Sequence, residues 1–203
     1  MYWEERYRSG GTSGRGSYGR YAELTAEIIN RIFRERRVED VIEYGCGDGN
    51  QLSYLHAPRY VGLDVSPTAV KRSADRFRTD PTKRFLLYNP GWHSEHDSEF
   101  SADCALSKDV VFHLVEDDAF ETYMRHLFAS GRRLVVIVAS DLDWYVGPHE
   151  RHRRFTPWVE AKLPEWQLVE KIDSPLPYNW KTGEGMLANV YVFEREAEPN
   201  HVD

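Results

Sequence analysis

Three glycines and an acid in the first third of the chain have the residue types and spacing of a nucleotide-binding device. The stretch 41–50 begins as an apolar strand and ends in the loop Gly45-x-Gly47-x-Gly49. Glycine permits positive φ and lets a ligand lie against bare backbone, and a following helix offers unpaired N–H groups. Glu43 stands just before the loop, where its carboxylate would repel a pyrophosphate and attract an ammonium group.

A second acid, Asp64, ends the next apolar stretch, 59–64. At the tip of a parallel strand it is placed to accept hydrogen bonds from both hydroxyls of a ribose. The G-x-G-x-G spacing is one residue tighter than the G-x-G-x-x-G fingerprint of dinucleotide-binding proteins. A nicotinamide-dependent oxidoreductase and a plain strand-to-helix turn are the alternatives.

The set E-x-G-C-G-x-G followed by G-L-D-x-S resembles motifs I and II of the class I S-adenosylmethionine-dependent methyltransferases, over about residues 38–138. The resemblance implies S-adenosylmethionine as the cofactor. It implies that the loop backbone holds the methionine part, that Glu43 receives its ammonium, that Asp64 holds the ribose and that Val65 lies against the adenine. The cofactor-binding residues implied in this way are Glu43, Gly45, Cys46, Gly47, Asp64, Val65, Asn89 (or its neighbour Tyr88) and Ser107.

The elements that must position these residues alternate between strand and helix. Apolar runs predict strands at 38–44, 60–64, 83–88, 102–107, 133–138, 166–172 and 187–194, and helical periodicity predicts helices at 21–34, 50–56, 67–77, 116–128 and 158–163. This is an α/β fold. The resemblance implies a doubly wound, seven-stranded, mostly parallel sheet in the order 3-2-1-4-5-7-6, with strand 7 antiparallel. His126 lies off the apolar stripe of its helix, and we expect it to be exposed.

Four residues are candidates for the catalytic base. His113 follows the tip of the fourth strand, and its ordinary pKa near 6.5 suits proton abstraction at neutral pH. A packed structural role is the alternative for His113. Asp109 comes second, as a base or an orienting carboxylate, and His149 and His152 come third, on a loop expected to close over the acceptor.

The acceptor is expected to contact three segments. The aromatic and basic residues in 141–158 and 175–181 would suit a ring or sugar that carries an anionic group. Residues 140–155 show no helical or strand period, and a long polar and aromatic loop in a compact domain is usually functional or disordered. Residues 1–20 are rich in glycine between aromatic anchors, which predicts a flexible lid, with a disordered tail as the alternative. The substrate-binding candidates are Tyr18, Tyr21, Trp144, His149 and Arg153. We expect residues 21–196 to form one domain and residues 197–203 to be frayed.

Composition narrows the function classes. The formal net charge of −7 argues against a general nucleic-acid binder. No apolar run approaches the ~20 residues of a membrane span, and the N-terminus lacks the apolar core of a signal peptide, so we expect a cytoplasmic protein. A homodimer is left open. His93-x-x-His96 and His149-x-x-His152 have metal-like spacing without an evident third ligand, and we predict no metal.

These observations predict methyl transfer from S-adenosylmethionine to a small polar acceptor. We favour O-methylation, rather than N-methylation, of a sugar or a natural product. The alternatives are an RNA or protein methyltransferase and a non-catalytic module that binds S-adenosylmethionine.

Overall fold

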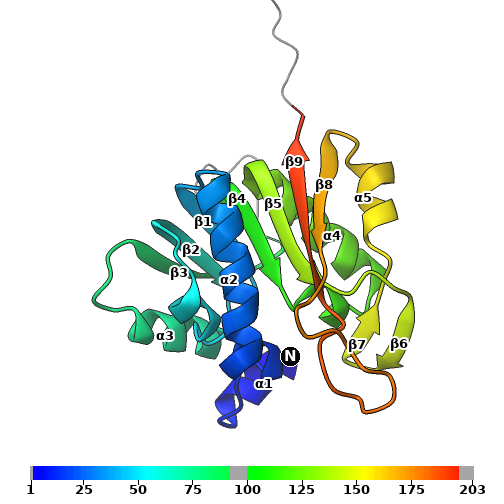
Figure 1. Ribbon diagram of the computed structural model, residues 1–203. Helices are drawn as coiled ribbons and strands as arrows, with labels where there is room; N and C mark the ends of the chain where they lie inside the picture. Colours follow the sequence, from blue (N-terminus) through cyan, green and yellow to red (C-terminus); the bar gives the residue numbers. More distant parts are fainter. Residues whose placement is uncertain (1, 92–99, 197–203) are drawn as a thin grey trace, which may run out of the picture.

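Alternating strands and helices form one seven-stranded sheet in the computed structural model, which describes residues 2–91 and 100–196 (Figure 1). The sheet order is β3-β2-β1-β4-β5-β9-β8. β9 is antiparallel to both of its neighbours. Counted along the chain, this is the predicted order 3-2-1-4-5-7-6, which is confirmed. The strands are β1 (Asp40–Tyr44), β2 (Arg59–Asp64), β3 (Lys83–Leu87), β4 (Ala102–Lys108), β5 (Gly131–Ala139), β8 (Trp166–Ile172) and β9 (Asn189–Arg195).

Helices cover both faces of this sheet. On one face, α2 (Gly19–Glu35) buries Ile29 and Ile32 against β1 and β4. On the other, α4 (Asp117–Ser130) packs against β4 and β5, and α5 (Thr156–Lys162) packs against β8 (Figure 1). β5 supplies alternate residues to the two clusters, as a parallel strand covered on both faces must.

α3 (Pro67–Arg76) follows β2 and begins where the sequence predicts. Ser66 is its N-cap, and the Ser66 hydroxyl accepts a hydrogen bond from the backbone N–H of Ala69 at 3.1 Å. Pro67 stands at the first helical position, where its missing N–H costs nothing. The short predicted helix at 50–56 is instead a single 3₁₀ turn, η2 (Gln51–Tyr54).

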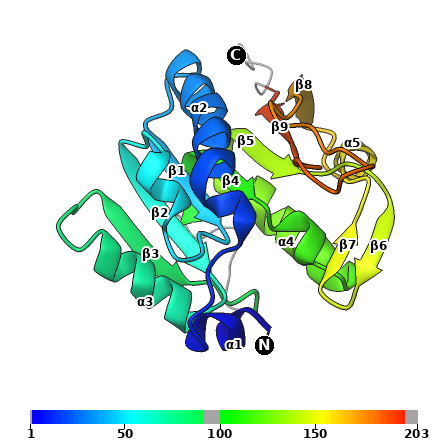
Figure 2. The same cartoon turned by 60° about the horizontal axis from the view of Figure 1, so that its bottom comes forward.

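The N-terminal segment folds against the edge of the sheet where the parallel strands end (Figures 1 and 2). It contains α1 (Tyr2–Arg8) and the 3₁₀ turn η1 (Arg15–Ser17). The Glu4 carboxylate accepts hydrogen bonds from the Ser66 hydroxyl at 2.5 Å and the Thr68 hydroxyl at 2.8 Å, which ties α1 to the start of α3.

Two further sequence expectations are wrong. Residues 140–155 contain an antiparallel hairpin, β6 (Trp144–Gly147) and β7 (Glu150–His152), whose strands are too short to show a period. His126 is buried rather than exposed. Its Nδ1 lies 2.8 Å from the Tyr88 hydroxyl, so a polar partner lets the ring enter the core.

Both cysteines are buried and unpaired. Within the described ranges, no helix is both long enough and apolar enough to span a bilayer. The predicted tail at 197–203 and the pair His93 and His96 lie outside the described residues.

Candidate functional site

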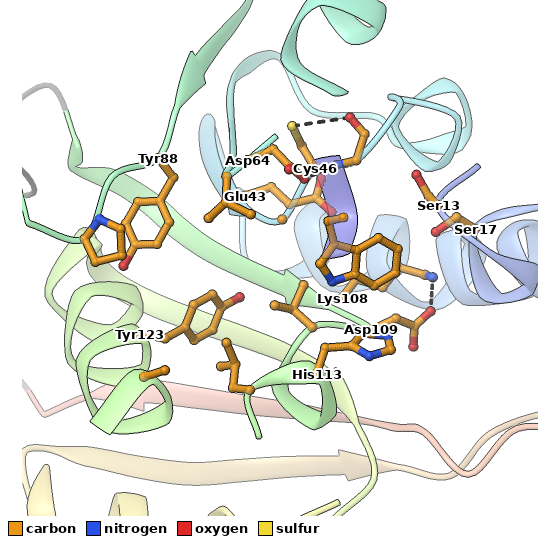
Figure 3. A pocket seen from close by; sticks show the side chains of 18 of the residues that line it. Ser13, Ser17, Glu43, Cys46, Asp64, Tyr88, Lys108, Asp109, His113 and Tyr123 are labelled. Carbon is orange, nitrogen blue, oxygen red and sulfur yellow. Dashed lines mark hydrogen bonds and ion pairs between the residues drawn. The ribbon is translucent and has the colours of Figure 1, made fainter. Parts of the chain in front are cut away.

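A cavity of about 500 Å³ opens at the carboxyl ends of β1, β2 and β4 (Figure 3). The chain leaves β1 on one side toward β2 and later returns to its other side as β4, and open α/β sheets bind ligands at such a reversal. Its volume is in the range of small-molecule sites, roughly 300–1,000 Å³. The lining is largely apolar and comes from the glycine loop, α1, the 3₁₀ turn η4 (Val111–His113) and α4.

The glycine loop forms one wall of the cavity. Gly45 and Gly47 have φ of 81° and 60°, which side chains rarely tolerate. A Cβ on Gly45 would meet Val110 Cγ2 at 2.4 Å, and a Cβ on Gly47 would meet Ser13 Oγ at 2.2 Å. The loop is therefore restricted to glycine by both conformation and space, and Cys46 between them also lines the cavity.

Glu43 lies in the wall beneath this loop and is 3% exposed. Burial raises the pKa of Glu43 to about 7, although the Tyr60 hydroxyl, which donates to its carboxylate at 2.5 Å, acts in the opposite direction. A buried carboxyl in a cavity wall is suited to a cationic ligand group, because pairing would repay the cost of its charge.

Asp64 faces the same cavity from the end of β2. One carboxylate oxygen accepts a hydrogen bond from the Gly47 N–H at 2.9 Å, and the other accepts from the Ser66 N–H at 2.8 Å. Burial raises the pKa of Asp64 to about 6, while these two bonds act to lower it. Asp64 thus ties the glycine loop to the second strand, and its two oxygens keep further lone pairs that suit hydroxyl donors of a ligand. Val65, the next residue, also lines the cavity.

His113 lines the opposite side, from η4 (Figure 3). Its Nδ1 lies 2.8 Å from the carbonyl oxygen of His149. A carbonyl can only accept, so Nδ1 carries the proton, and Nε2 of the neutral ring is an unprotonated acceptor. Burial lowers the pKa of His113, which keeps the ring neutral at neutral pH.

Lys108 and Asp109 complete the polar lining at the end of β4. The Lys108 ammonium lies 2.5 Å from Asp109 Oδ2 and donates to the carbonyl of Gly16 at 2.9 Å. Asp109 adopts φ of 58°, a left-handed conformation that aspartate tolerates better than most residues. Asp109 therefore serves as an ion-pair partner inside the cavity.

The predicted base His152 lies elsewhere, in β7 outside the lining. Its Nδ1 contacts the Ser140 hydroxyl at 2.5 Å, and its Nε2 contacts the Glu150 carboxylate at 2.8 Å. The ring also stacks on Trp144, with centroids 5.4 Å apart. Both nitrogens are occupied by residues in or next to the hairpin, so His152 holds the hairpin and does not line the cavity.

The predicted acceptor contacts also lie outside the lining. The Tyr18 hydroxyl donates to Asp48 at 2.8 Å. The Tyr21 ring lies under the guanidinium of Arg15. Trp144 stacks on His152 instead of facing the cavity.

The last two acceptor candidates are engaged by other parts of the chain. The His149 ring stacks on Tyr2 at 4.1 Å between centroids, so its backbone carbonyl, rather than its side chain, serves the site. Arg153 donates to the Leu114 carbonyl at 3.1 Å and pairs with Asp117. These contacts hold both side chains outside the cavity lining.

Two of the predicted cofactor contacts, Asn89 and Ser107, do not line the cavity, although a neighbour of each does. Asn89 caps the turn after β3 through a 3.0 Å bond from Gly91 N–H, while Tyr88 reaches the cavity. Ser107 is fully buried behind the wall, 2.7 Å from the hydroxyl of Tyr123, which does line it.

Sequence reasoning missed Trp3 and Tyr7, which line the cavity from α1. Trp3 meets the His113 ring edge-on, with centroids 4.9 Å apart. One signal was present in the sequence, because acids stand in the first turn and arginines in the last turn of α1, which favours a helix. Trp3 and Tyr7 are four residues apart and share one face of that helix.

Comparison with known proteins gives the same family. The sequence pattern of the methyltransferase domain family matches residues 18–173. A probable thiol methyltransferase 2 from Arabidopsis thaliana is 27% identical over 127 residues, which are 62% of this chain. The match spans 53% of that relative, so the chain covers about half the length of the curated relative it matches.

Solved structures share the fold at low identity. The methyltransferase domain of the bacterial protein CtHen1-C superposes with a TM-score of 0.67 at 19% identity, covering 86% of this chain and 98% of that one. Magnesium protoporphyrin IX methyltransferase from Synechocystis PCC 6803 gives 0.65 at 12% identity, with 95% and 94% covered. The N-methyltransferase NodS from Bradyrhizobium japonicum gives 0.66 at 14% identity, with 87% and 88% covered. Because the family pattern spans more than half of the chain, the chain belongs to the methyltransferase domain family, and its sheet is that of the class I S-adenosylmethionine-dependent methyltransferases.

Proposed function

We propose that this chain transfers a methyl group from S-adenosylmethionine to a hydroxyl of a small molecule, a sugar or a natural product. The observation that carries the proposal is that one cavity joins two different kinds of wall. The glycine loop, Glu43 and Asp64 form one, and the imidazole of His113 forms the other. The first suits the cofactor of this family, and the second suits the removal of a proton from an acceptor.

The residues present fit the cofactor. The glycine loop would hold the methionine part, the Glu43 carboxylate would receive its ammonium, and Asp64 would accept from the ribose hydroxyls. Val65 and Tyr88 line the cavity where the adenine would lie. When bound, S-adenosylmethionine supplies an electrophilic methyl group on a positively charged sulfur. The chain's own part is to hold the acceptor in line with it, which can contribute about 7–11 kcal/mol.

His113 is the base in this proposal. Its Nδ1–H is directed to the His149 carbonyl, so Nε2 is the nitrogen left to take the acceptor's proton. Trp3 packs against the ring edge and limits its rotation. Asp109 is less suited to the role, because its carboxylate is already paired with Lys108.

The lining indicates the class of acceptor. It is largely apolar, and its charged groups are mostly acidic, with Glu43, Asp64, Asp109 and Asp118 against Lys108. An anionic acceptor would be repelled. This favours a natural product with a largely apolar body over a sugar, and it argues against RNA. The three arginines of residues 140–155 do not change this, because Arg151 and Arg153 pair with Asp117 and Arg154 lies outside the cavity lining.

A thiol is the second candidate acceptor, and the probable thiol methyltransferase from Arabidopsis thaliana favours it. A small apolar thiol suits the same lining. A free thiol ionises near pH 8.5, far below an aliphatic hydroxyl, so it needs the base less. Turnover of a thiol that survives in a His113→Ala variant at pH 9 would favour this candidate over a hydroxyl.

We also propose that residues 1–20 act as a lid. Trp3 and Tyr7 cover the cavity, and the segment is held to the core by polar contacts that water could replace. Access of ligands would then require the segment to move away.

The function is tested in two steps. Thermal shift with S-adenosylhomocysteine and with NAD separates a methyltransferase from a nicotinamide enzyme. We expect S-adenosylhomocysteine to stabilise the protein and NAD not to. Transfer of labelled methyl to a panel of small phenols, sugars, amines and thiols then identifies the acceptor. Stabilisation by NAD alone would refute the proposal, whereas binding without turnover of any acceptor, RNA and protein included, would favour a non-catalytic module.

A further inference from the structure

Lys108 is a buried cation whose place in the cavity is not explained by the reaction. It is the last residue of β4, and its side chain is 1% exposed. β4 pairs with β1 so that Leu106 lies opposite Glu43. Side chains alternate along a strand, so Lys108, two residues after Leu106, lies on the same face of the sheet as Glu43. Both line the cavity.

The ammonium group of Lys108 has donor capacity to spare. Its hydrogen bonds within the described residues go to the Gly16 carbonyl and to Asp109. An ammonium carries three donors, so a third remains for a ligand. The ion pair with Asp109 offsets the cost of burying the cation when no ligand is present.

A cation and an anion on one face of a single cavity match the charges of an α-amino acid. Such a group carries an ammonium and a carboxylate on the same carbon. The hydroxyl-bearing residues Ser13 and Ser17 also line this cavity, and Ser17 adjoins the Gly16 carbonyl that Lys108 holds (Figure 3). The positive charge of Lys108 also acts to lower the pKa of Glu43, which shows that the two groups lie within electrostatic reach.

We propose that Lys108 binds the carboxylate of the methionine part of S-adenosylmethionine, opposite the ammonium that Glu43 receives. The inference rests on the proposed function and extends it to a residue that fixes which cofactors fit. The ligand carboxylate and Asp109 would both contact the Lys108 ammonium. The bond from Lys108 to the Gly16 carbonyl would hold that ammonium in place. A ligand that lacks the carboxylate would lose this contact alone.

The test compares two ligands in calorimetric titrations of the full chain without acceptor. S-adenosylmethionine carries both charges, whereas its decarboxylated form keeps the ammonium and lacks the carboxylate. We expect the wild-type protein to prefer S-adenosylmethionine by roughly 10- to 100-fold, the range of a charge-assisted hydrogen bond. In Lys108→Met the ratio of the two affinities should fall to about one, through weaker binding of S-adenosylmethionine only.

Glu43→Gln is the matched variant. Loss of the Glu43 carboxylate should weaken the binding of both ligands and leave the ratio of their affinities unchanged. Lys108→Arg should restore part of the preference. Lys108→Met leaves the Asp109 carboxylate without its ion-pair partner. If the Lys108→Met variant unfolds, the double variant Lys108→Met with Asp109→Asn removes both charges, and the ratio of the two affinities is measured in it instead. An unchanged preference in Lys108→Met, or an equal loss for both ligands, would overturn the assignment while leaving the proposed function intact. A wild-type protein that binds neither ligand would instead overturn the proposed function.

Discussion

Ser13 and Asp48 hold each other through two hydrogen bonds that run in opposite directions. The Ser13 N–H donates to Asp48 Oδ2 at 3.0 Å, and the Asp48 N–H donates to Ser13 Oγ at 3.0 Å. The Tyr18 hydroxyl adds a third bond to the same carboxylate oxygen at 2.8 Å. Burial acts to raise the pKa of Asp48, but the bonds from Tyr18 and Ser13 hold it below its ordinary value. The N-terminal segment is therefore fastened directly to the glycine loop.

Replacing Asp48 by alanine should release this segment. Ser13 and Tyr18 would lose a charged acceptor, which costs on the order of 1–3 kcal/mol in the docking of the segment. We expect faster proteolysis within residues 9–17 and a lower kcat/KM, with the sheet intact. Limited proteolysis, circular dichroism and turnover measure these effects.

Asp80→Ala is the control for that change, since Asp80 also accepts side-chain and backbone bonds, from Thr82, but is half-buried and lies outside the cavity lining. Deleting residues 1–17 should reproduce the loss of turnover. Unchanged proteolysis in Asp48→Ala, or a wild-type rate in the deletion, would show that the segment is only a tail.

Glu43 should reduce the stability of the protein without cofactor. Burial raises its pKa to about 7, well above the roughly 4.3 of an exposed glutamate, so folding favours the neutral form. The protein is therefore most stable with respect to Glu43 below pH ~4, where the carboxyl is neutral in both the folded and the unfolded state. This stability is lost as the pH rises toward 7. Glu43→Gln, which keeps an acceptor for Tyr60, should be more stable than wild type at pH 8 by on the order of 1–3 kcal/mol.

Urea unfolding at pH 5 and pH 8 checks this prediction. The advantage of Glu43→Gln should be smaller at pH 5, because wild-type Glu43 is then mostly neutral. Equal differences at the two pH values would mean that Glu43 is not the titrating group. A less stable variant at pH 8 would mean that its charge is already paired.

Asp64→Ala should abolish cofactor binding. The variant removes the acceptor for the ribose and also frees the Gly47 N–H, so the glycine loop loses one of its ties to β2, while the bonds from the Gly45 and Cys46 N–H groups to the Leu63 carbonyl remain. We expect affinity for S-adenosylhomocysteine to fall at least about 100-fold, as loss of two or more charge-assisted bonds implies. Calorimetry measures it, and normal affinity would refute the ribose assignment.

Local patterns predicted the fold and the cofactor wall, because a strand, a glycine loop and a capped helix are each encoded within about ten residues. Gly45, Gly47 and Asp64 act through backbone that neighbouring residues determine. The acceptor side depends on contacts between distant segments. His113 and His152 looked alike in the sequence, and what separates them is that Ser140 and Glu150 occupy both nitrogens of His152.

The same reasoning explains why the sequence did not predict which residues of the N-terminal segment line the cavity. Tyr18 and Tyr21 are nearer to the glycine loop in sequence than Trp3 is, yet only Trp3 reaches the cavity. The chain turns back through Ser13, whose position depends on Asp48, 35 residues away. A single sequence carries no direct signal for such a pairing.

His113→Ala should separate proton removal from cofactor binding. Because the Nδ1–H is fixed by the His149 carbonyl, Nε2 can accept a proton whenever the ring is neutral, and the variant should lose about 10²- to 10⁴-fold in kcat for a hydroxyl acceptor. Burial lowers the pKa of His113, so the acidic limb of the wild-type pH–rate profile should lie below 6.5 and be absent from the variant. Affinity for S-adenosylhomocysteine should not change. His56→Ala, at an exposed position outside the cavity lining, is the control and should keep both the rate and the limb. A full rate in His113→Ala would move the base elsewhere, and a persistent limb with a reduced rate would make His113 a packing residue beside Trp3 rather than the group that takes the proton.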